Sequence, residues 1–258
     1  MDIGTAKPTE ELRLKVPHHL IDIKEPDEQF NLGEFIRRAD QLVSEIRNRG
    51  KIPIVSGGTA YYLKHFIYGL PTSPKADPAV REQLKRELNE RGSETLYREL
   101  ENLDPLSAER IAPGDTYRIL RALEVYRSSG KPLSAYPPAA SPREGLDCVT
   151  VGLYRDREEL NRRIDERVDI MIQQGLVDEV KGFISRGYGP NTPGMRGIGY
   201  REFFLMRESG CMTLEDVKEL IKRNSRRYAK RQMTFFRQLP DVVWVHPEER
   251  SFFESAVF

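Results

Sequence analysis

The sequence predicts an α/β core with a parallel sheet, interrupted by an all-helical insertion. Short apolar segments alternate with helix-periodic segments near both ends of the chain, which is typical of βα units. Residues 77–130 contain only helical patterns, and a linker with four prolines follows at 131–144. We therefore expect the core at 1–76 and 145–258 and the insertion at 77–144.

The first part of the core is predicted to alternate strand and helix. Residues 18–23 and 52–56 are short, largely apolar segments and are predicted strands. Between them, Asn31 is an N-cap residue before a helix whose apolar residues recur at intervals of three and four, and Gly50 ends that helix. A Gly-Gly-Thr turn at 57–59 then leads into a helix at 60–67.

The later elements follow from the same periodicities. The insertion contains three predicted helices, at 78–91, 94–103 and 115–128. The core resumes with a strand at 148–154, two long helices and a closing strand. We place these last three elements at 157–186, 213–239 and 242–245.

Composition excludes several classes of protein. The 258 residues are 38% hydrophobic and 31% charged, and the mean hydropathy is −0.58. No run approaches the roughly 18 apolar residues of a membrane span, and the first residues lack the apolar stretch of a signal peptide. Cys148 and Cys211 form no ligand cluster and suit a reducing compartment. We expect a cytoplasmic protein without a membrane contact.

The net charge of +1 hides a basic stripe near the C-terminus. Residues 222–237 contain seven basic side chains and no acidic one, with Tyr228, Phe235 and Phe236 among them. Because no acidic side chain lies within the stripe itself, the stripe indicates a polyanion, either nucleic acid or pyrophosphate. The alternative is a solvated helix face that happens to be basic.

Two glycine-containing motifs are candidate anion sites. The Ser-Gly-Gly-Thr sequence at 56–59 follows an apolar segment and opens a helix, so its amides suit a phosphate or a base edge. The Arg-Gly-Ile-Gly-Tyr-Arg sequence at 196–201 offers two guanidinium groups for phosphate and an aromatic ring for a base. An ordinary βα turn and a loop of accidental composition are the respective alternatives.

Other charged clusters have simpler interpretations. Arg118 and Arg121 share a helix face, but pairing with Glu124 on a surface helix is an equally good interpretation. Asp165, Glu166 and Asp169 alternate with arginines, so we interpret them as i,i+4 ion pairs on one helix. The histidines lack the spacing of a metal centre, and no metal-ligating residue is predicted.

Seven motifs, in order along nearly the whole chain, resemble the tRNA dimethylallyltransferases, also called tRNA isopentenyltransferases. They are DIGTAKP at 2–8, PHHLID at 17–22, GGT at 57–59, ADP at 76–78, RALEV at 121–125, RGIGYR at 196–201 and KRQ at 230–232. The resemblance implies a P-loop-NTPase-like parallel-sheet core with a helical insertion that grips the anticodon stem. It also implies transfer of a dimethylallyl group from dimethylallyl diphosphate to N6 of adenosine 37, in tRNAs that read codons beginning with U. Mg²⁺ is the implied cofactor and the tRNA anticodon stem-loop the implied partner, and we expect a monomer.

The resemblance also assigns roles to residues of this chain. Thr59 and Arg196 are the expected catalytic residues, and Gly57, Gly58, Arg196 and Lys230 the expected diphosphate-binding residues. The expected tRNA contacts are Thr59, Arg81, Tyr117, Arg118, Ile119, Leu120, Arg121, Arg196, Gly197, Ile198, Gly199, Tyr200, Arg201, Lys230, Arg231, Gln232 and Arg237.

In the family, a first strand, a diphosphate-binding P-loop and an aspartate thought to be the general base precede the DIGTAK stretch. The given sequence begins at that stretch, so we expect it to lack all three. This expectation leaves an alternative function, a catalytically inactive fragment that binds the tRNA anticodon stem. A small-molecule nucleotide kinase is a weaker alternative, because no Walker A sequence occurs in the chain.

Overall fold

The computed structural model describes residues 1–70, 72–75, 77–137, 139 and 141–249. Internal contacts divide the chain into two compact units, 1–63 with 147–258, and 64–146. The sequence-based boundaries for the insertion were 77 and 144, and the predicted boundary residue at 76 lies outside the described residues.

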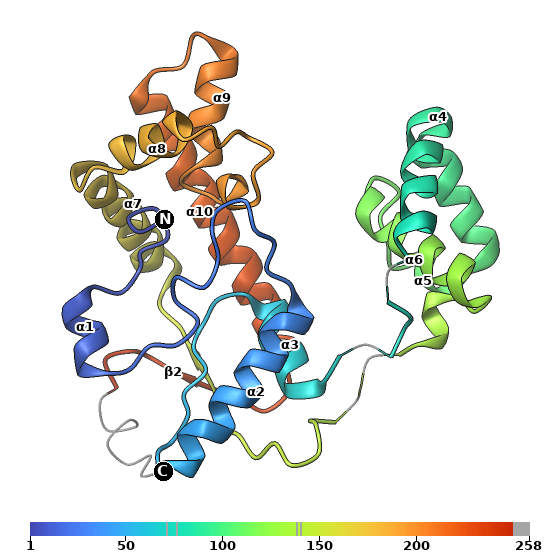
Figure 1. The fold of residues 1–258 in the computed structure, drawn as a ribbon, viewed down its shortest axis with the longest axis horizontal. Helices are drawn as coiled ribbons and strands as arrows, with labels where there is room; N and C mark the ends of the chain where they lie inside the picture. Colours follow the sequence, from blue (N-terminus) through green and yellow to red (C-terminus); the bar gives the residue numbers. More distant parts are fainter. Residues whose placement is uncertain (71, 76, 138, 140, 250–258) are drawn as a thin grey trace. The chain divides into compact units, whose positions relative to one another are not determined.

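The N-terminal part of the first unit contains two helices and the start of a third (Figure 1). These are α1 (Glu10–Lys15), α2 (Leu32–Asn48) and α3 (Ala60–Tyr68). The side chain of Asn31 accepts a hydrogen bond from the Glu34 amide at 3.0 Å, which confirms the predicted N-cap of α2.

A small parallel sheet confirms the α/β class of the core. Strand β1 (Thr150–Leu153) pairs with β2 (Val242–Val245), and Thr150 lies opposite Val242 in the register. Parallel neighbours need a long crossover, and here the chain between the strands forms four α-helices and a short 3-10 helix.

The two other predicted strands are wrong, because residues 18–23 and 52–56 form no strand. Leu20 and Asp22 have φ angles of 59° and 55°, which lie in the left-handed region and interrupt an extended segment. In the second segment Ile54 is 82% exposed. Neither segment has a neighbouring strand in the described part of the chain, so neither can form a hydrogen-bonded ladder.

Helices form most of the crossover between the strands. They are α7 (Arg157–Gln173), α8 (Leu176–Ser185), the short 3-10 helix η2 (Pro193–Arg196), α9 (Arg201–Ser209) and α10 (Leu214–Phe236). The single long helix predicted at 157–186 is wrong, because Gly175 has a φ of 100° and separates α7 from α8. That backbone conformation favours glycine and cannot continue a helix.

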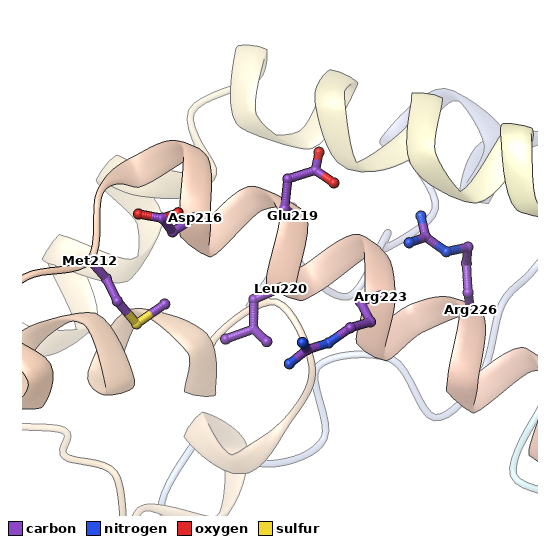
Figure 2. A pocket seen from close by; sticks show the side chains of 6 residues that line it. All are labelled: Met212, Asp216, Glu219, Leu220, Arg223 and Arg226. Carbon is purple, nitrogen blue, oxygen red and sulfur yellow. The ribbon is translucent and has the colours of Figure 1, made fainter.

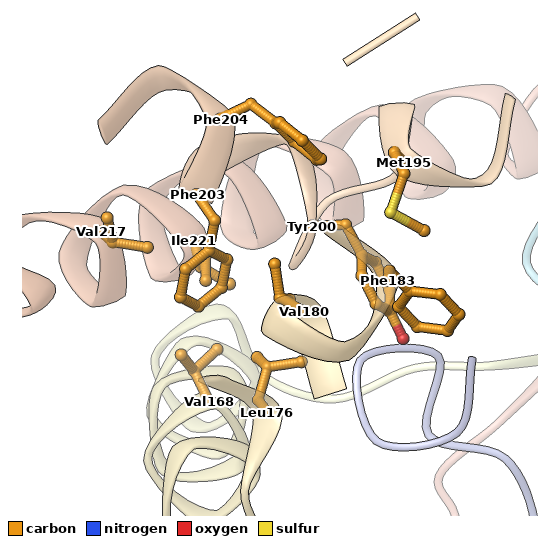
Figure 3. Packing of buried hydrophobic residues seen from close by; sticks show 10 residues of the cluster. All are labelled: Val168, Leu176, Val180, Phe183, Met195, Tyr200, Phe203, Phe204, Val217 and Ile221. Atoms are coloured by element: carbon orange, nitrogen blue, oxygen red, sulfur yellow. The ribbon is translucent and has the colours of Figure 1, made fainter. Parts of the chain in front are cut away.

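The core of the first unit lies among these helices (Figure 3). Its buried residues come from α7, α8, η2, α9 and α10, and from the loop before α9. They are Val168, Leu176, Val180, Phe183, Met195, Tyr200, Phe203, Phe204, Val217 and Ile221. Met1 and Ile3 pack against this cluster, so the N-terminal segment is tied to the same core.

The second unit is helical, as the sequence predicts. It contains α4 (Pro78–Leu103), α5 (Pro105–Ala108), α6 (Thr116–Ser129) and the 3-10 turn η1 (Leu133–Ala135). A left-handed φ of 76° at Gly92 kinks α4 between the two helices predicted there. Helices α4 and α6 pack together over a core that includes Leu84, Leu96 and Leu123.

No helix in the described ranges is long and apolar enough to cross a membrane.

Candidate functional site

Helix α10 carries the basic stripe and is anchored at its start by a capping box. The Thr213 side chain accepts from the Asp216 amide at 3.2 Å, and the Asp216 carboxylate accepts from the Thr213 amide at 2.8 Å. One face of the helix buries Val217 and Ile221 in the core. The helix is therefore a fixed support for the charged side chains on its other faces.

Two basic residues of the stripe have acidic partners on α7, contrary to the sequence-based interpretation. Lys222 lies 2.9 Å from Asp169, and Arg226 pairs with Asp165. The hydrogen bond with Lys222 lowers the pKa of the Asp169 carboxyl. Lys222 also lies 3.2 Å from Glu219 on its own helix. The two partners on α7 were missed because they belong to a neighbouring helix, and spacing within one helix cannot reveal them.

Only some of the ion pairs predicted within α7 form in the described residues, because two of its carboxylates pair with α10. Arg162 and Glu166 approach to 3.8 Å as predicted. Asp165 and Asp169 instead turn to α10, so the interpretation of all three carboxylates as local pairs is wrong. Figure 2 shows the side chains of Arg223 and Arg226 pointing in different directions from α10. Around these two arginines, a hollow of about 450 Å³ is also lined by Met212, Asp216, Glu219 and Leu220.

The remaining basic side chains of the stripe are exposed and have no ion pair with a described residue. They are Arg223, Arg227, Lys230, Arg231 and Arg237. Three of them line a shallow groove of about 530 Å³ along the C-terminal half of α10, together with Thr234, Phe235 and Gln238. Arg231 also lies over the Tyr228 ring, 5.8 Å from its centroid. This groove has the charge and aromatic content of a polyanion-binding face.

The Gly-Gly-Thr turn is attached directly to this half of α10. The Gln232 side-chain amide donates to the Gly58 carbonyl at 2.8 Å. Gln232 was predicted to contact tRNA, and the structure gives its side chain a partner inside the protein. Gly57 and Thr59 are exposed at the start of α3, so the turn remains accessible.

The loop at 196–201 presents one arginine and holds the other. Arg196 and Gly197 are exposed, and Arg196 has no ion pair with a described residue. Arg201 instead places its Nε 3.0 Å from the carboxylate of Glu202, which is completely buried. Arg201 therefore already has an anionic partner inside the protein, whereas Arg196 has none among the described residues.

Tyr200 and Gly199, two of the predicted tRNA contacts, are buried in this structure. The Tyr200 hydroxyl donates to the Glu179 carboxylate at 3.1 Å, and burial raises the pKa of this phenol. The same carboxylate accepts from the amides of Ile3 and Gly4, both at 3.2 Å. In Figure 3 the Tyr200 ring lies beside Phe183 with its hydroxyl toward the N-terminal loop. Ile198 is partly buried against the same core.

The predicted contacts in the helical unit also divide into exposed and internal side chains. Tyr117 is 68% exposed, and Arg81 lies 5.8 Å from the centroid of its ring. Arg118 is exposed and pairs with Asp115 at 3.3 Å.

Three other predicted tRNA contacts of the helical unit have partners inside the protein. Ile119 is 1% exposed and belongs to the core of the unit, while Leu120 packs against that core. Arg121 pairs with buried Glu124 at 3.1 Å and donates to the Pro74 carbonyl at 2.6 Å. The interpretation that Arg121 pairs with Glu124 is therefore the correct one. The 3.6-residue period of the helix puts both residues on the inner side of α6.

Sequence reasoning missed three residues that hold the loops of this site: Glu179, Glu202 and Asn224. Asn224 donates to Glu202 at 2.7 Å from α10. One signal was available for Glu202, because an acidic side chain three residues after Gly199 can accept from that amide, and it does so at 2.9 Å. Nothing in the spacing reveals the partners of Glu179, which are more than twenty residues away along the chain.

The described residues contain no group of three or more His, Cys, Asp or Glu side chains able to hold a metal ion. A dedicated protein cage for Mg²⁺ therefore does not fit the residues that the structure describes. Mg²⁺ commonly binds through substrate phosphates and water instead.

The fold and the site define an α/β protein with a helical second unit and a basic helix suited to a polyanion. The IPP transferase family model matches residues 1–239. The chain belongs to this family, and the resemblance stated from its motifs is confirmed.

Named relatives and solved structures support the same assignment. A tRNA dimethylallyltransferase of Geobacter sulfurreducens is 44% identical over 95% of this chain and 79% of its own length. One from Borreliella burgdorferi is 42% identical, over 96% of this chain and 81% of its own.

Two solved structures are similar in fold. The tRNA isopentenylpyrophosphate transferase of Bacillus halodurans has a TM-score of 0.68 at 37% identity, over 99% of this chain and 81% of its own. A eukaryotic dimethylallyltransferase acting on tRNA has a TM-score of 0.76 at 26% identity, over 99% and 66%. The P-loop-NTPase-like fold class is thereby confirmed, although the described sheet has only two strands.

Proposed function

We propose that this chain transfers a dimethylallyl group from dimethylallyl diphosphate to N6 of adenosine 37, in tRNAs that read codons beginning with U. The observation that carries the proposal is the hydrogen bond from Gln232 to Gly58. It joins a glycine-rich turn suited to phosphate or a base to the basic half of a helix suited to an RNA backbone. The family and its named members supply the reaction class.

The reaction forms one bond and breaks two. The N6 nitrogen forms a bond to the allylic carbon, the carbon–oxygen bond to the diphosphate breaks, and N6 loses a proton to solvent water. The base must leave its stack to reach the donor. Negative charge grows on the departing pyrophosphate, so cationic and amide donors around it lower the barrier.

Residues of this chain are available for each of these roles. We assign Arg196, Lys230 and the amides of Gly57 and Gly58 to the diphosphate, because Arg196 and Lys230 are exposed cations without an ion pair in the described residues. Thr59, exposed beside the same turn, is assigned to the reacting base. Lys230, Arg231 and Arg237, with the remaining exposed cations of α10, are assigned to the stem backbone, where they position the RNA without reading its sequence. In the helical unit, Arg81, Tyr117 and Arg118 are assigned to the same substrate.

Mg²⁺, a monomeric state and the cytoplasm complete the proposal. Since the described residues offer no metal cage, Mg²⁺ would arrive with the donor diphosphate and retain water ligands. Cys148 and Cys211 are free and exposed, which suits a reducing compartment. Light scattering should give a mass near the 29.8 kDa of one chain.

The decisive experiment combines transfer and binding in one sample. The chain is incubated with Mg²⁺, dimethylallyl diphosphate and an anticodon stem-loop RNA bearing A37, and modified adenosine is detected by mass. An RNA with guanosine at position 37 is the control, because guanosine lacks the N6 amine. Modification of the first RNA alone supports the proposal.

The alternative, an inactive tRNA-binding fragment, is not favoured, because the relatives named as transferases match about four-fifths of their own length. It predicts RNA binding without a product in the same assay. That result would refute the proposed transfer while leaving tRNA recognition in place.

A further inference from the structure

A completely buried carboxylate lies beneath the loop at 196–201. Glu202 has no exposed side-chain surface, and its two oxygens accept from three donors. These are the Gly199 amide at 2.9 Å, Arg201 Nε at 3.0 Å and Asn224 Nδ2 at 2.7 Å. The donors come from the loop, from α9 and from α10, so one side chain joins three parts of the chain.

Burial of the Glu202 carboxylate costs free energy unless each lost water contact is replaced, so its three donors must stay in place. A buried carboxylate is tolerated only when hydrogen bonds and a counter-charge replace its water, and here both are present. Asn224 is the one donor on α10, so the Glu202–Asn224 hydrogen bond fixes the loop on the helix that carries the basic groove.

A second carboxylate holds the other side of the same loop. Glu179 on α8 accepts from the Tyr200 hydroxyl and from amides of the N-terminal segment. Between the two carboxylates the loop has little freedom, and Arg196 is its exposed cation without an ion pair in the described residues. Groups that stabilise a developing charge act best when their surroundings hold them in place beforehand.

We propose that Glu202 and Asn224 are a positioning pair, which holds the loop on α10 so that Arg196 meets the diphosphate together with Lys230. The inference rests on the proposed function and assigns roles to two residues that touch neither substrate. Their effect passes through the loop backbone at Gly199 and the counter-ion Arg201.

Two single variants and their combination test the pair. Glu202→Gln replaces one of the two acceptor oxygens by an NH2 group, which must face either the Gly199 amide or the Arg201 and Asn224 donors. Asn224→Asp places two carboxylates together. Each variant should therefore lower kcat roughly 10- to 100-fold. The double variant restores one donor–acceptor contact with the order of the groups reversed, and should recover at least part of the loss. The dissociation constant for the RNA should stay within about threefold throughout, because the exposed face of α10 is unchanged.

A merely structural role is excluded by a matched control. Val168→Ala removes buried apolar volume from the same core and should lower the melting temperature by leaving a cavity. It changes none of the hydrogen bonds that hold the loop. Each variant is assayed at a temperature at which all are folded. If Glu202→Gln keeps the kcat of Val168→Ala, or if the double variant recovers nothing, the positioning role is refuted.

Binding of inorganic pyrophosphate tests the pair without catalysis. Wild type should bind it more tightly than Arg196→Ala and Glu202→Gln by similar factors of about ten. Equal affinity of wild type and Glu202→Gln would overturn the inference even if transfer is observed. Absence of transfer by wild type would refute the proposed function instead, and the pyrophosphate comparison would still decide whether Glu202 positions Arg196.

Discussion

The side chain of Gln232 donates to the backbone carbonyl of Gly58 at 2.8 Å, across 174 positions of sequence. A β-carbon on Gly58 would lie 2.1 Å from the same Gln232 nitrogen, so the contact requires glycine at this position. The turn before α3 is therefore positioned by α10. Both parts of the proposed site move together if that helix shifts.

Gly58→Ala should break this contact. We expect displacement of the Gln232 side chain, loss of about 1 kcal/mol of stability and a roughly tenfold lower transfer rate. Gly189→Ala is the matched control, because nothing lies within 4 Å of a β-carbon built there and Gly189 has no role in the proposed site. Thermal unfolding and single-turnover kinetics of both variants make the comparison, and similar losses in the two would contradict the assigned role of the contact.

Tyr200→Phe should lower stability without changing RNA affinity, whereas Tyr117→Ala should lower RNA affinity. The first removes a buried hydroxyl bonded to Glu179 and should lower the melting temperature by about 2–4 °C, with RNA affinity unchanged. The second removes an exposed ring and should weaken RNA binding about fivefold or more, because stacking on a base is lost. Fluorescence anisotropy with labelled RNA tests both, and weaker binding by Tyr200→Phe would restore the stacking role to that residue.

The salt dependence of RNA binding should separate the paired from the unpaired cations of α10. Combined replacement of Arg227 and Lys230 by Ala should reduce the slope of log affinity against log salt by up to about 2. Arg226→Ala should leave the slope nearly unchanged, because Asp165 already neutralises that guanidinium. A larger change with Arg226→Ala than with the double variant would show that the groove is not the binding face.

Stability of the helical unit should depend on pH through Glu87. Two hydrogen bonds from Arg127, at 2.7 and 2.8 Å, lower the pKa of the Glu87 carboxyl from 4.5 to about 2. The pKa is lower in the folded state, so this contribution is complete above about pH 4.5 and disappears as the pH falls toward 2. Glu87→Gln should cost about 1–2 kcal/mol at pH 7 and much less at pH 2–3.

Circular dichroism melts of the full chain at both pH values give the comparison. Glu82→Gln is the control, since Glu82 pairs with Lys85 on an exposed surface. A constant difference in melting temperature between wild type and Glu87→Gln across this range would contradict the assigned origin of its stabilisation.

Several helices of this protein could be predicted because their signals are local, although α7 and α8 were predicted as one helix and α1 and α9 were not predicted. Asn31 caps α2 and Asp77 caps α4, as the residue types indicate. The strands could be predicted less well, because an apolar segment becomes a strand only where another strand pairs with it. Residues 148–154 find such a partner at 242–245, and residues 52–56 find none in the described chain.

The candidate site shows the same division between local and distant information. The motifs correctly identified the family and brought Arg196, the Gly-Gly-Thr turn and α10 to attention. They did not reveal that Tyr200 and Ile119 are buried, since an aromatic or apolar residue in a motif can serve either packing or binding. Nor did they reveal that Arg201 neutralises a buried carboxylate, whereas the spacing of Arg121 and Glu124 had offered that pair as one of two interpretations.

Residue order and spacing were sufficient for the family, the helices and the presence of a basic stripe. These features depend on interactions between residues a few positions apart, or on motifs that can be compared directly. Which cations remain available to a polyanion was decided by tertiary packing. Lys222 and Arg226 pair with Asp169 and Asp165 of α7, because Coulomb attraction depends on distance in space, and these two carboxylates are more than fifty residues away in sequence.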